Sequence, residues 1–545
     1  MIELILRQKK LIQVIKNMRY PFDKKGKYIF PFFLIGMFAV SGCMVGPDYS
    51  RPDSKVQTQF SQPLKSEFTE EIPTHPGTLL NPVQWWMGFN DPTLSTLLAR
   101  AAKDNLSLQN AALRIYQARA SLGVADATLL PTVGLGGSAA RTNQPSALTQ
   151  ATGASPYSNS QSLIVQATWE IDFWGKYRRG IESATSSLIA TAAAFYAADT
   201  SLAAEVANTY ISIRNYEALK AVATTNLALQ AESLRIAQSR YRNGATSLLD
   251  LSQAQSQYEQ TKADIPVIIA SLKKSQYAMS LLLGELPNYY ELNFGKTKGT
   301  IKPPRALEVG IPKDLLRRRP DVLQAEYAAA AQSALIGVNV AALYPSFSLS
   351  GYFGFQNATF NNSTQTSLFS WDNRNSSISG SFMFPLFYRG AIIDQIRVQD
   401  AVFQQSVLTY QNQVLLAQKE VEDALISIST TRSSAEDLKK SVTAAQQAAS
   451  LALDRYKAGQ NDYNTVIVAQ QQLLAVQNSL VQTTTNNLLG YVAAFKALGG
   501  GWSGNMSMPQ LPEQMVQTMR ARSDWGTALN DPSDLRLVKS SEANK

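Results

Sequence analysis

The chain has 545 residues, a formal net charge of +9, one cysteine and one histidine. This composition excludes an intrachain disulfide framework, and also a Cys/His catalytic pair or a histidine-rich zinc site built within one chain. Residues 1–42 hold eight basic and two acidic residues and so carry most of the excess charge, which gives no reason to expect a nucleic-acid partner. We therefore expect neither an enzyme nor a bound cofactor.

The N-terminus has the pattern of a lipoprotein signal peptide over residues 1–42. A basic stretch and an apolar run over 28–40 precede a Ser-Gly pair and then Cys43. The run is shorter than the roughly 20 residues that a membrane-spanning helix needs, but it suits a secretory signal. The junction resembles the bacterial lipoprotein box, which implies a covalent lipid on Cys43, and Met44 after it implies the outer membrane. An incidental thiol is the alternative, and translation could start at Met18 rather than at the first residue.

An acylated, extended strap is predicted for residues 43–92. Most of it is rich in proline, serine, threonine and glutamine, and His75 within it is expected to be exposed to solvent. Asp91 then suits the N-cap of a helix, with a proline at the first helical position. We expect this helix to run from Thr93 to Leu130, where another proline ends it.

A strand hairpin is predicted after that helix, because the apolar period changes to two from Thr132 onward, with a polar loop over 142–161. Its second strand, 162–173, has one apolar and one mostly polar face. That pattern fits a strand between lipid and a polar lumen, and also a half-buried strand of a soluble sheet. Arg178 and Arg179 follow, either as interface residues or as solvated charges. The residues expected to line a lumen are Gln166, Thr168, Glu170 and Asp172.

Two helices complete the first repeat, which spans 93–284. A long proline-poor helix over 176–242 ends before Gly244, which suits a left-handed C-cap. The return helix, 247–284, contains a proline that should kink it. A proline-rich linker over 285–313 follows.

The same pattern then occurs again. Leu130–Val133 matches Tyr344–Phe347 at an offset of 214, and Arg240–Gly244 matches Arg455–Gly459 at an offset of 215. Two anchors at nearly equal offsets indicate a tandem duplication. The second repeat is therefore assigned to 314–498, and the tail, 499–545, has no assigned role.

The longest predicted element is a helix over 389–456 in the second repeat. Between Val407 and Tyr456 its apolar residues alternate at spacings of three and four, with one threonine as the exception, which is typical of coiled-coil packing. At 1.5 Å per residue the helix would reach roughly 100 Å. A further strand pair, over 346–356 and 378–386, precedes it.

Four strands cannot close a barrel, although each is long enough to cross a bilayer when tilted. An open edge in lipid leaves unsatisfied backbone groups, so other copies of the chain must close the sheet. Two copies would give eight strands with a filled interior, whereas three would give twelve and room for a lumen. Strands in lipid therefore predict a homo-oligomer.

Several ordered motifs resemble the TolC-like outer-membrane efflux factors, in particular the acylated OprM-like, or NodT-type, branch. The resemblance covers about residues 43–500. The motifs are Trp85-Trp86, Phe89 and Asp91-Pro92; Trp169 to Gly175 with Arg178-Arg179; and Asp314 to Asp321 with Gln324-Ala325-Glu326. It implies an α+β membrane protein in which a long antiparallel α-helical barrel adjoins a transmembrane β-barrel that trimerisation completes, with four strands per chain.

The resemblance also implies a function. The chain would be the outer-membrane channel of a tripartite efflux system in a Gram-negative bacterium, a passive homotrimeric exit duct for small molecules. Its partners would be a periplasmic adaptor, also called a membrane fusion protein, and an inner-membrane RND-type pump. The alternatives are a lipid-anchored coiled-coil structural or adhesive envelope protein and, third, a periplasmic lipoprotein enzyme.

By this resemblance the two helical reversals form a periplasmic tip that docks the adaptor. Its residues would be Tyr241, Arg242, Asn243, Gly244, Tyr456, Lys457, Gly459 and Asp462. The branch's acidic constriction residue falls on Val468 here, a departure, so the candidate gate residues are Asp250, Asp462 and Val468. The glycines could instead only let the chain turn, and the carboxylates could only favour helix starts.

Overall fold

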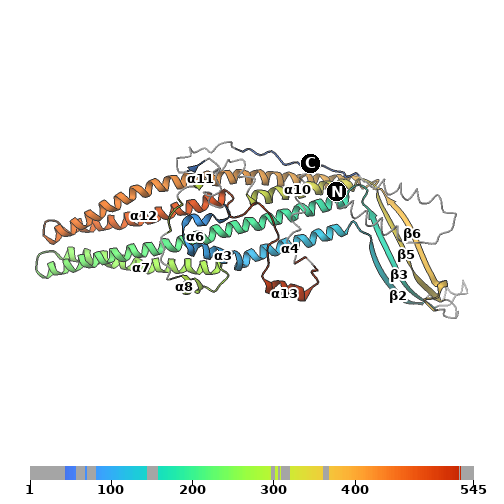
Figure 1. Cartoon of the computed structure of the whole chain (residues 1–545), viewed down its shortest axis with the longest axis horizontal. Coiled ribbons are helices and arrows are strands. Elements are labelled where there is room, and N and C mark those ends of the chain that lie inside the picture. Colours follow the sequence, from blue (N-terminus) through green and yellow to red (C-terminus); the bar gives the residue numbers. More distant parts are fainter. Residues whose placement is uncertain are drawn as a thin grey trace. The chain divides into compact units, whose positions relative to one another are not determined.

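The computed structural model describes most of the chain and divides into two compact units (Figure 1). The described residues are 43–56, 68–69, 82–143, 157–295, 301–304, 307–308, 319–359, 367–526 and 528–529. Of these residues, the sheet unit takes in those that lie within Met1–Pro47, Thr128–Gly180 and Ile336–Ile396, and the helical unit takes in the others. The predicted signal peptide, His75 and the end of the tail lie outside the described residues.

The sheet unit contains the four predicted strands, β2 (Thr132–Asn143), β3 (Tyr157–Ile171), β5 (Ser346–Thr359) and β6 (Arg374–Met383). They form one antiparallel sheet in the order β2-β3-β5-β6, so the hairpins of the two repeats lie side by side. The short 3-10 turn η2 (Trp371–Asn373) leads into β6. The polar loop between β2 and β3 is shorter than predicted because both strands extend into it.

The end of β6 corrects one prediction. The strand stops at Met383, opposite Ser346, and does not reach residue 386. Pro385 explains the difference, because it has no backbone N–H and cannot continue a sheet ladder. Four strand ends thus lie at one end of the sheet, which we call the sheet foot. It consists of Thr132, Ile171, Ser346 and Met383.

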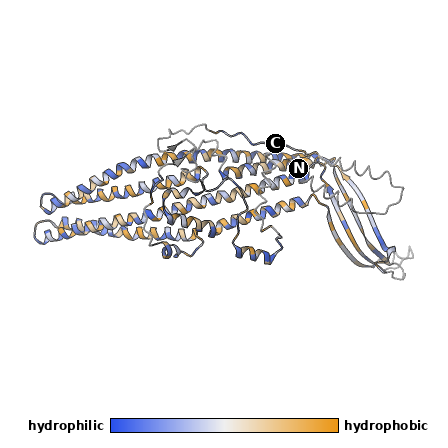
Figure 2. Ribbon diagram, viewed as in Figure 1, coloured by the Kyte–Doolittle hydropathy of each residue, from blue (hydrophilic) through white to orange (hydrophobic). Residues whose placement is uncertain are grey.

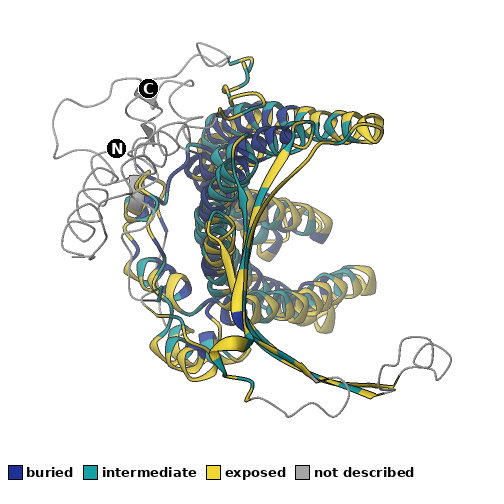
Figure 3. Cartoon of the chain, turned by 90° about the vertical axis from the view of Figure 1, so that its right-hand side faces the viewer, coloured by how far each residue is buried: buried dark blue, intermediate teal, exposed yellow. Residues whose placement is uncertain are grey.

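The register places most of the large apolar residues of all four strands on a single face, with Ile164 and Met383 as exceptions. Directly paired residues share a face of a sheet, and Leu135 pairs with Val165, which pairs in turn with Phe353. Hydrophobic and hydrophilic residues alternate along the strands (Figure 2). Most of the sheet is exposed or partly buried (Figure 3). The exposed large residues of the apolar face are Val133, Leu135, Val165, Phe347, Leu349, Phe353, Ile378 and Phe382.

The first helical segment corrects a second prediction, since it is broken in two. Helix α3 (Pro92–Asp104) ends at Asn105, and α4 (Leu106–Ala127) starts after it. The Asn105 side chain accepts a hydrogen bond from the amide of Leu108 (2.9 Å) and donates one to the carbonyl of Leu282 (2.9 Å). It therefore caps a new helix while tying it to a neighbour. Asp91 caps α3 as predicted, accepting from the Thr93 amide at 2.8 Å.

The long helices confirm the duplication. Helices α6 (Lys176–Arg242) and α11 (Arg389–Lys457) are each followed by a return helix, α7 (Leu248–Leu282) and α12 (Tyr463–Ala497), of 35 residues. Helix α10 (Pro320–Ala341) matches α4 at 22 residues. Helix α7 continues through Pro266 as one helix. None of the helices described in the structure combines the length and apolar character that crossing a membrane requires.

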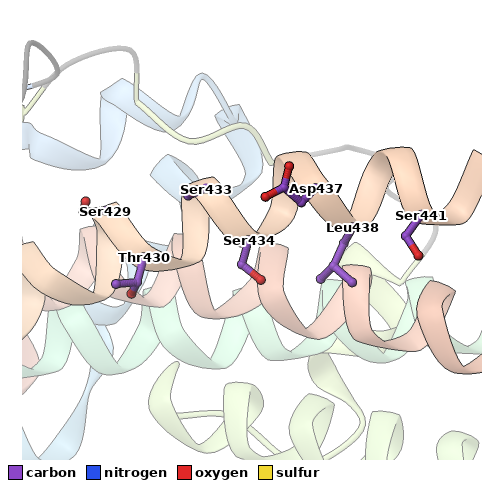
Figure 4. A pocket seen from close by; sticks show the side chains of 7 residues that line it. All are labelled: Ser429, Thr430, Ser433, Ser434, Asp437, Leu438 and Ser441. Atoms are coloured by element: carbon purple, nitrogen blue, oxygen red, sulfur yellow. The ribbon is translucent and has the colours of Figure 1, made fainter.

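The heptad stripe of α11 lies in the core over most of its length. Val407, Val414, Val421 and Ile428 are buried, and the last two belong to a core cluster with residues of α3, α6, α7 and α12. Around Thr431 the stripe becomes only partly buried. A shallow groove follows the polar side of α11 there (Figure 4). It is lined by Ser429, Thr430, Ser433, Ser434, Asp437, Leu438 and Ser441.

The linker and the tail are more ordered than the sequence indicates. The linker contains helix α8 (Tyr289–Phe294) and strand β4 (Leu307–Glu308), which pairs in parallel with β1 (Phe68–Thr69) of the strap. The 3-10 helix η1 (Pro82–Phe89) buries Trp85 in the core. The tail contains α13 (Glu513–Arg522) and buries Trp502, whose ring lies 5.3 Å from that of Tyr196.

Candidate functional site: the paired helical reversals

The reversals between α6 and α7 and between α11 and α12 have the same backbone geometry. In the first, the Gly244 amide donates to the Tyr241 carbonyl at 3.0 Å, and the Ala245 amide to the Arg240 carbonyl at 2.8 Å. In the second, the equivalent bonds of Gly459 and the following residue measure 3.0 and 2.9 Å. These paired bonds define a Schellman cap, which closes a helix with a left-handed residue.

The two glycines are required by backbone conformation rather than by space. Gly244 has φ of 69° and Gly459 has φ of 73°, in the left-handed region. A Cβ on Gly244 would meet nothing within 4 Å, and one on Gly459 would meet only the guanidinium of Arg240, 3.6 Å away. Any L-residue there would therefore be strained by its own backbone.

Arg240, at the end of α6, joins the two reversals. Its Nη1 donates to the backbone carbonyls of Tyr456 and, at 3.4 Å, of Lys457, while Nη2 donates to Ala245 of its own reversal at 3.2 Å. Its guanidinium carbon also lies 4.8 Å from the centre of the Tyr456 ring. One cation therefore links the C-terminal carbonyls of α11, where the helix dipole favours positive charge, to the backbone of the α6–α7 reversal.

A second set of contacts connects Tyr456 of α11 to the start of α7. The Tyr456 hydroxyl donates to Thr246 Oγ1 at 3.4 Å, and the Thr246 hydroxyl donates to a carboxylate oxygen of Asp250. We call Arg240, Thr246, Asp250 and Tyr456 the tip latch. The candidate gate residue Asp250 thus belongs to a chain of hydrogen bonds that reaches the opposite reversal.

The latch rests on a small apolar core. Tyr456 and Tyr463 are each only 1% exposed and pack edge to face with ring centres 5.1 Å apart. Leu234 and Ala254 join them, so all four long helices contribute to the cluster. Burial, reinforced by the neighbouring Tyr456 and Asp250, raises the pKa of Tyr463 well above its usual range. Its hydroxyl therefore stays neutral at physiological pH.

Polar contacts continue the association of α12 with α6 and α7 away from the tip. Their shared feature is an amide or hydroxyl pair bridging two helices. They are Gln470 to Ser233 (2.8 Å), Gln471 to Gln257 (2.8 Å), Asn226 to Gln477 (2.7 Å) and Thr485 to Asn215 (2.9 Å). Such side-chain bonds between helices are easier to exchange for water than apolar packing is.

The predicted docking residues divide into an exposed and a buried group. Tyr241, 41% exposed, and its neighbours lie on the surface, whereas the repeat-equivalent Tyr456 is buried. Leu248 and Leu249, which no local sequence pattern marks as docking residues, are 59% and 65% exposed at the start of α7. The exposed predicted residues are Tyr241, Arg242, Asn243, Gly244, Lys457, Gly459 and Asp462.

The other two gate candidates are not part of the latch. Asp462 occupies the N-cap position of α12, but its side chain makes no capping hydrogen bond. Val468 is 57% exposed on α12. Arg240, by contrast, was recognised only as part of a repeat, because Arg455 occupies the equivalent position and the sequence does not tell which arginine crosses to the other reversal.

The four predicted lumen residues belong to the sheet unit. Gln166, Thr168 and Glu170 share the polar face of β3. Glu170 also pairs with Lys176 (3.1 Å). Asp172 lies just after β3 and caps α6, accepting from the Arg178 amide at 3.0 Å and from its side chain at 3.1 Å.

The two arginines at the start of α6 differ in their exposure to solvent. Arg178 forms its ion pair with Asp172, and Arg179 is only 2% exposed. The alternative of solvated charges is therefore wrong for Arg179, because its guanidinium is enclosed by other segments of the sheet unit.

Comparison with known proteins identifies the architecture. The sequence signature described as "Outer membrane efflux protein" matches residues 97–285 and 311–500, one segment for each repeat. The chain belongs to this family. The family is one of transport channels, so the protein is an outer-membrane channel component of an efflux system, as predicted.

Individual members of the family cover nearly the whole chain. Nodulation protein T of Rhizobium leguminosarum bv. trifolii is 29% identical over 477 residues, which are 88% of this chain and 98% of that protein. The probable outer membrane lipoprotein SilC of Salmonella typhimurium is 27% identical over 474 residues, or 86% of this chain and 97% of that protein.

Solved structures confirm the predicted fold class. The outer-membrane channel OprN is similar with a TM-score of 0.75 and 27% identity, over 84% of this chain and 100% of that one. The open state of the MtrE outer-membrane channel of Neisseria gonorrhoeae, at 23% identity, matches in fold with a TM-score of 0.70 over 85% and 100% of the two chains. The fold is that of a helical barrel joined to a β-barrel.

Proposed function

We propose that three copies of this chain form a passive exit duct for small molecules. The observation that carries the proposal is the four-stranded sheet with a continuous exposed apolar face. Within the described residues, β2 and β6 each pair on one side only. In lipid every unpaired backbone group costs several kcal/mol, so β6 of one copy pairs with β2 of the next.

The number of copies follows from the size of the lumen. An eight-stranded barrel is filled by its own side chains, whereas twelve strands leave an open interior. The polar face of β3, with Gln166, Thr168 and Glu170, then lines that interior together with serines of the neighbouring strands. Ser350 and Ser379, for example, are hydrogen-bonded across β5 and β6 at 2.8 Å. Apart from Glu170, which pairs with Lys176, the side chains named here are uncharged hydroxyls and amides, and they provide a wet wall with little selectivity.

The tip provides the docking surface for a periplasmic adaptor. Tyr241, Leu248 and Leu249 expose apolar surface beside polar and charged residues, which is the composition of a protein contact. The adaptor connects the duct to an inner-membrane RND-type pump, which supplies the energy for export. The channel itself contributes a path and a closure.

The tip latch is that closure. Its polar contacts hold the α11–α12 reversal against the α6–α7 reversal through Arg240 and the Tyr456–Thr246 hydrogen bond, above the apolar cluster. A partner that offers the guanidinium alternative acceptors can release the Arg240 contact. Because the Schellman bonds lie within each reversal, release of the latch leaves both reversals folded. Asp250 takes part through Thr246.

A lipid on Cys43 is the second attachment to the membrane. Cys43 is exposed at the start of the described chain, and it follows the small residues of the lipoprotein box. A single acyl chain holds a protein at a membrane only weakly. In a chain whose strands already cross the bilayer, its contribution is therefore to placement rather than to retention.

The proposal is tested by particle mass and by conductance. The processed protein, purified in detergent, should have the mass of three chains, and in a planar bilayer it should pass ions through long-lived, weakly selective openings. A monomeric particle without detergent, or a trimer that never conducts even after the tip latch is removed, would refute the duct.

A further inference from the structure

The segment that follows Cys43 is bound by the sheet unit rather than loosely attached to it. The amide of Val45 donates to the backbone carbonyl of Trp174 at 3.1 Å. The guanidinium of Arg179 donates from Nε to the Val45 carbonyl at 3.2 Å and from Nη2 to the Gly46 carbonyl at 3.3 Å. The backbone polar groups of Val45 and the carbonyl of Gly46 are therefore hydrogen-bonded to Trp174 and Arg179, which lie where β3 gives way to α6.

The geometry of the Arg179 side chain suits this contact, and no other amino acid reproduces it. Its planar guanidinium offers donors in a fixed fork, so it can reach two carbonyls of one extended segment at once. A lysine ammonium is a point donor and cannot reproduce the fork. With 2% exposure, the side chain is removed from water, and its bonds to the segment replace hydration.

Three glycines let the backbones approach. A Cβ on Gly46 (φ 92°) would lie 2.4 Å from the Cα of Gly337 in α10. A Cβ on Gly337 would lie 2.9 Å from both the Val45 carbonyl oxygen and Cγ of Arg179. A Cβ on Gly175 would lie 2.9 Å from the Cα of Met44. No side chain fits at these positions unless the segment moves.

The bound segment lies against aromatic residues next to the sheet foot. Trp174, whose carbonyl holds Val45, stacks on Tyr344 with ring centres 4.7 Å apart and donates from its indole to the Pro345 carbonyl at 2.8 Å. Phe173 contacts both Trp174 (4.8 Å) and Phe347 (5.9 Å). Aromatic rings at strand ends are typical of the level at which a membrane sheet meets the interface.

We propose that Arg179, Gly175 and Gly337 form a clamp that fixes Met44–Gly46 and so places an acyl chain on Cys43 beside the apolar face at the sheet foot. Arg179 is a positioning residue in this arrangement. The inference rests on the lipidation proposed above. Cys43 lies two residues before Val45, so at about 3.5 Å per residue it stays within roughly 7 Å of the clamp.

The clamp gives the lipid a defined place on the barrel. An unclamped strap would let the acyl chain enter the bilayer anywhere within its reach, whereas the clamped one inserts it in the leaflet that contains the sheet foot. There it covers the exposed apolar residues of the strands, of which Val133 is one.

The test compares Gly337→Ala with Gly180→Ala. Both glycines lie in helices, but a Cβ on Gly180 meets nothing within 4 Å and this residue directly follows Arg179. Full-length protein is produced with a diazirine-bearing palmitate analogue that labels Cys43, irradiated in membranes, and its cross-links are mapped. Hydrogen exchange of the Val45 amide is measured on the same preparations.

We expect wild type and Gly180→Ala to give acyl cross-links to residues of the sheet foot and a protected Val45 amide. Gly337→Ala should lose most of these cross-links and exchange Val45 at least about ten times faster, with trimers intact. Arg179→Lys should behave like Gly337→Ala.

Two results would overturn the proposal. Unchanged cross-links and exchange in Gly337→Ala would show that no clamp exists, even with Cys43 labelled. Absence of any label on Cys43 would overturn both the lipidation and the placement of the acyl chain. If the Val45 amide were still protected in that case, the clamp would exist and only the lipidation would be wrong.

Discussion

Replacing Arg240 with alanine should release the closed tip. The change removes the hydrogen bonds to the carbonyls of Tyr456, Lys457 and Ala245 and the contact with the Tyr456 ring. The Schellman caps and the tyrosine cluster beneath them remain. The substitution therefore weakens the contact between the two reversals without removing the structure of either one.

The magnitude follows from these contacts. A hydrogen bond from a charged donor contributes about 1.5–3 kcal/mol, and a partly exposed cation–π contact about 0.5–1 kcal/mol. Arg240 is half-buried and two of its bonds exceed 3 Å, so the lower values apply. Only the bonds to Tyr456 and Lys457 cross between the reversals, and at the lower value they contribute about 3 kcal/mol for each latch. This corresponds to a shift on the order of 10² in the ratio of open to closed tips.

Single-channel recording in planar bilayers measures that shift. Arg240→Ala should raise the open probability or the conductance strongly, and Arg240→Lys should give an intermediate effect because a lysine keeps the charge but not the fork. Arg235→Ala is the matched control. Arg235 lies on the same helix, but its side chain is exposed and pairs within the helix with Glu232 at 2.7 Å.

A double-mutant cycle with Tyr456→Leu locates the effect. If Arg240 acts through the Tyr456 ring and backbone, the two substitutions should be less than additive. The reasoning is refuted if Arg240→Ala conducts like wild type and Arg235→Ala while remaining trimeric.

Gly244→Val and Gly459→Val should each reduce pump-dependent export while detergent-stable trimers persist, because a left-handed L-residue costs about 1–2 kcal/mol at each cap; normal export by both variants would contradict this. Cys43→Ala should abolish acyl labelling, and persistent label on that variant would disprove lipidation. Burial raises the pKa of Asp199 on α6 to about 6. The unfolded carboxyl ionises near its ordinary value, so the folded state binds more protons between pH 4 and 6, and stability should fall by about 2 kcal/mol as pH rises through that window. Asp199→Asn should flatten this dependence in thermal melts, whereas an equal slope in both proteins would exclude Asp199 as its source.

The long helices and the strand hairpins could be predicted because their signals are periodic and local. The predicted helix 176–242 has the bounds of α6, and the heptad positions from Val407 to Ile428 are buried as expected. Errors occurred where a single residue ends an element. Asn105 could be an ordinary polar residue of a helix, and only its hydrogen bond to Leu282 from a distant segment makes it a break.

The positions of the two helical reversals could be predicted from the sequence, but the side-chain contacts between them could not. Repeat spacing located both reversals, and glycine chemistry predicted their caps. Which tyrosine is buried could not be read from Arg-Tyr pairs that look alike at 240–241 and 455–456. The clamp was missed for the same reason, since it joins residues from three distant segments whose only local signals are single glycines and an arginine.

The divergence of the two repeats is what makes a one-sided latch possible. Both reversals have the same backbone bonds, so a symmetric pair would offer two equivalent arginine bridges. Instead Tyr456 is buried, and its carbonyl and ring contact the guanidinium of Arg240, while Tyr241 and Arg455 are exposed. The α11–α12 reversal therefore receives the bridge and the α6–α7 reversal supplies it. A docking partner that offers the Arg240 guanidinium other acceptors breaks the polar contact between the reversals, and the apolar cluster around Tyr456 and Tyr463 then separates as the tip opens. That asymmetry makes Arg240 the residue at which a partner can start the opening.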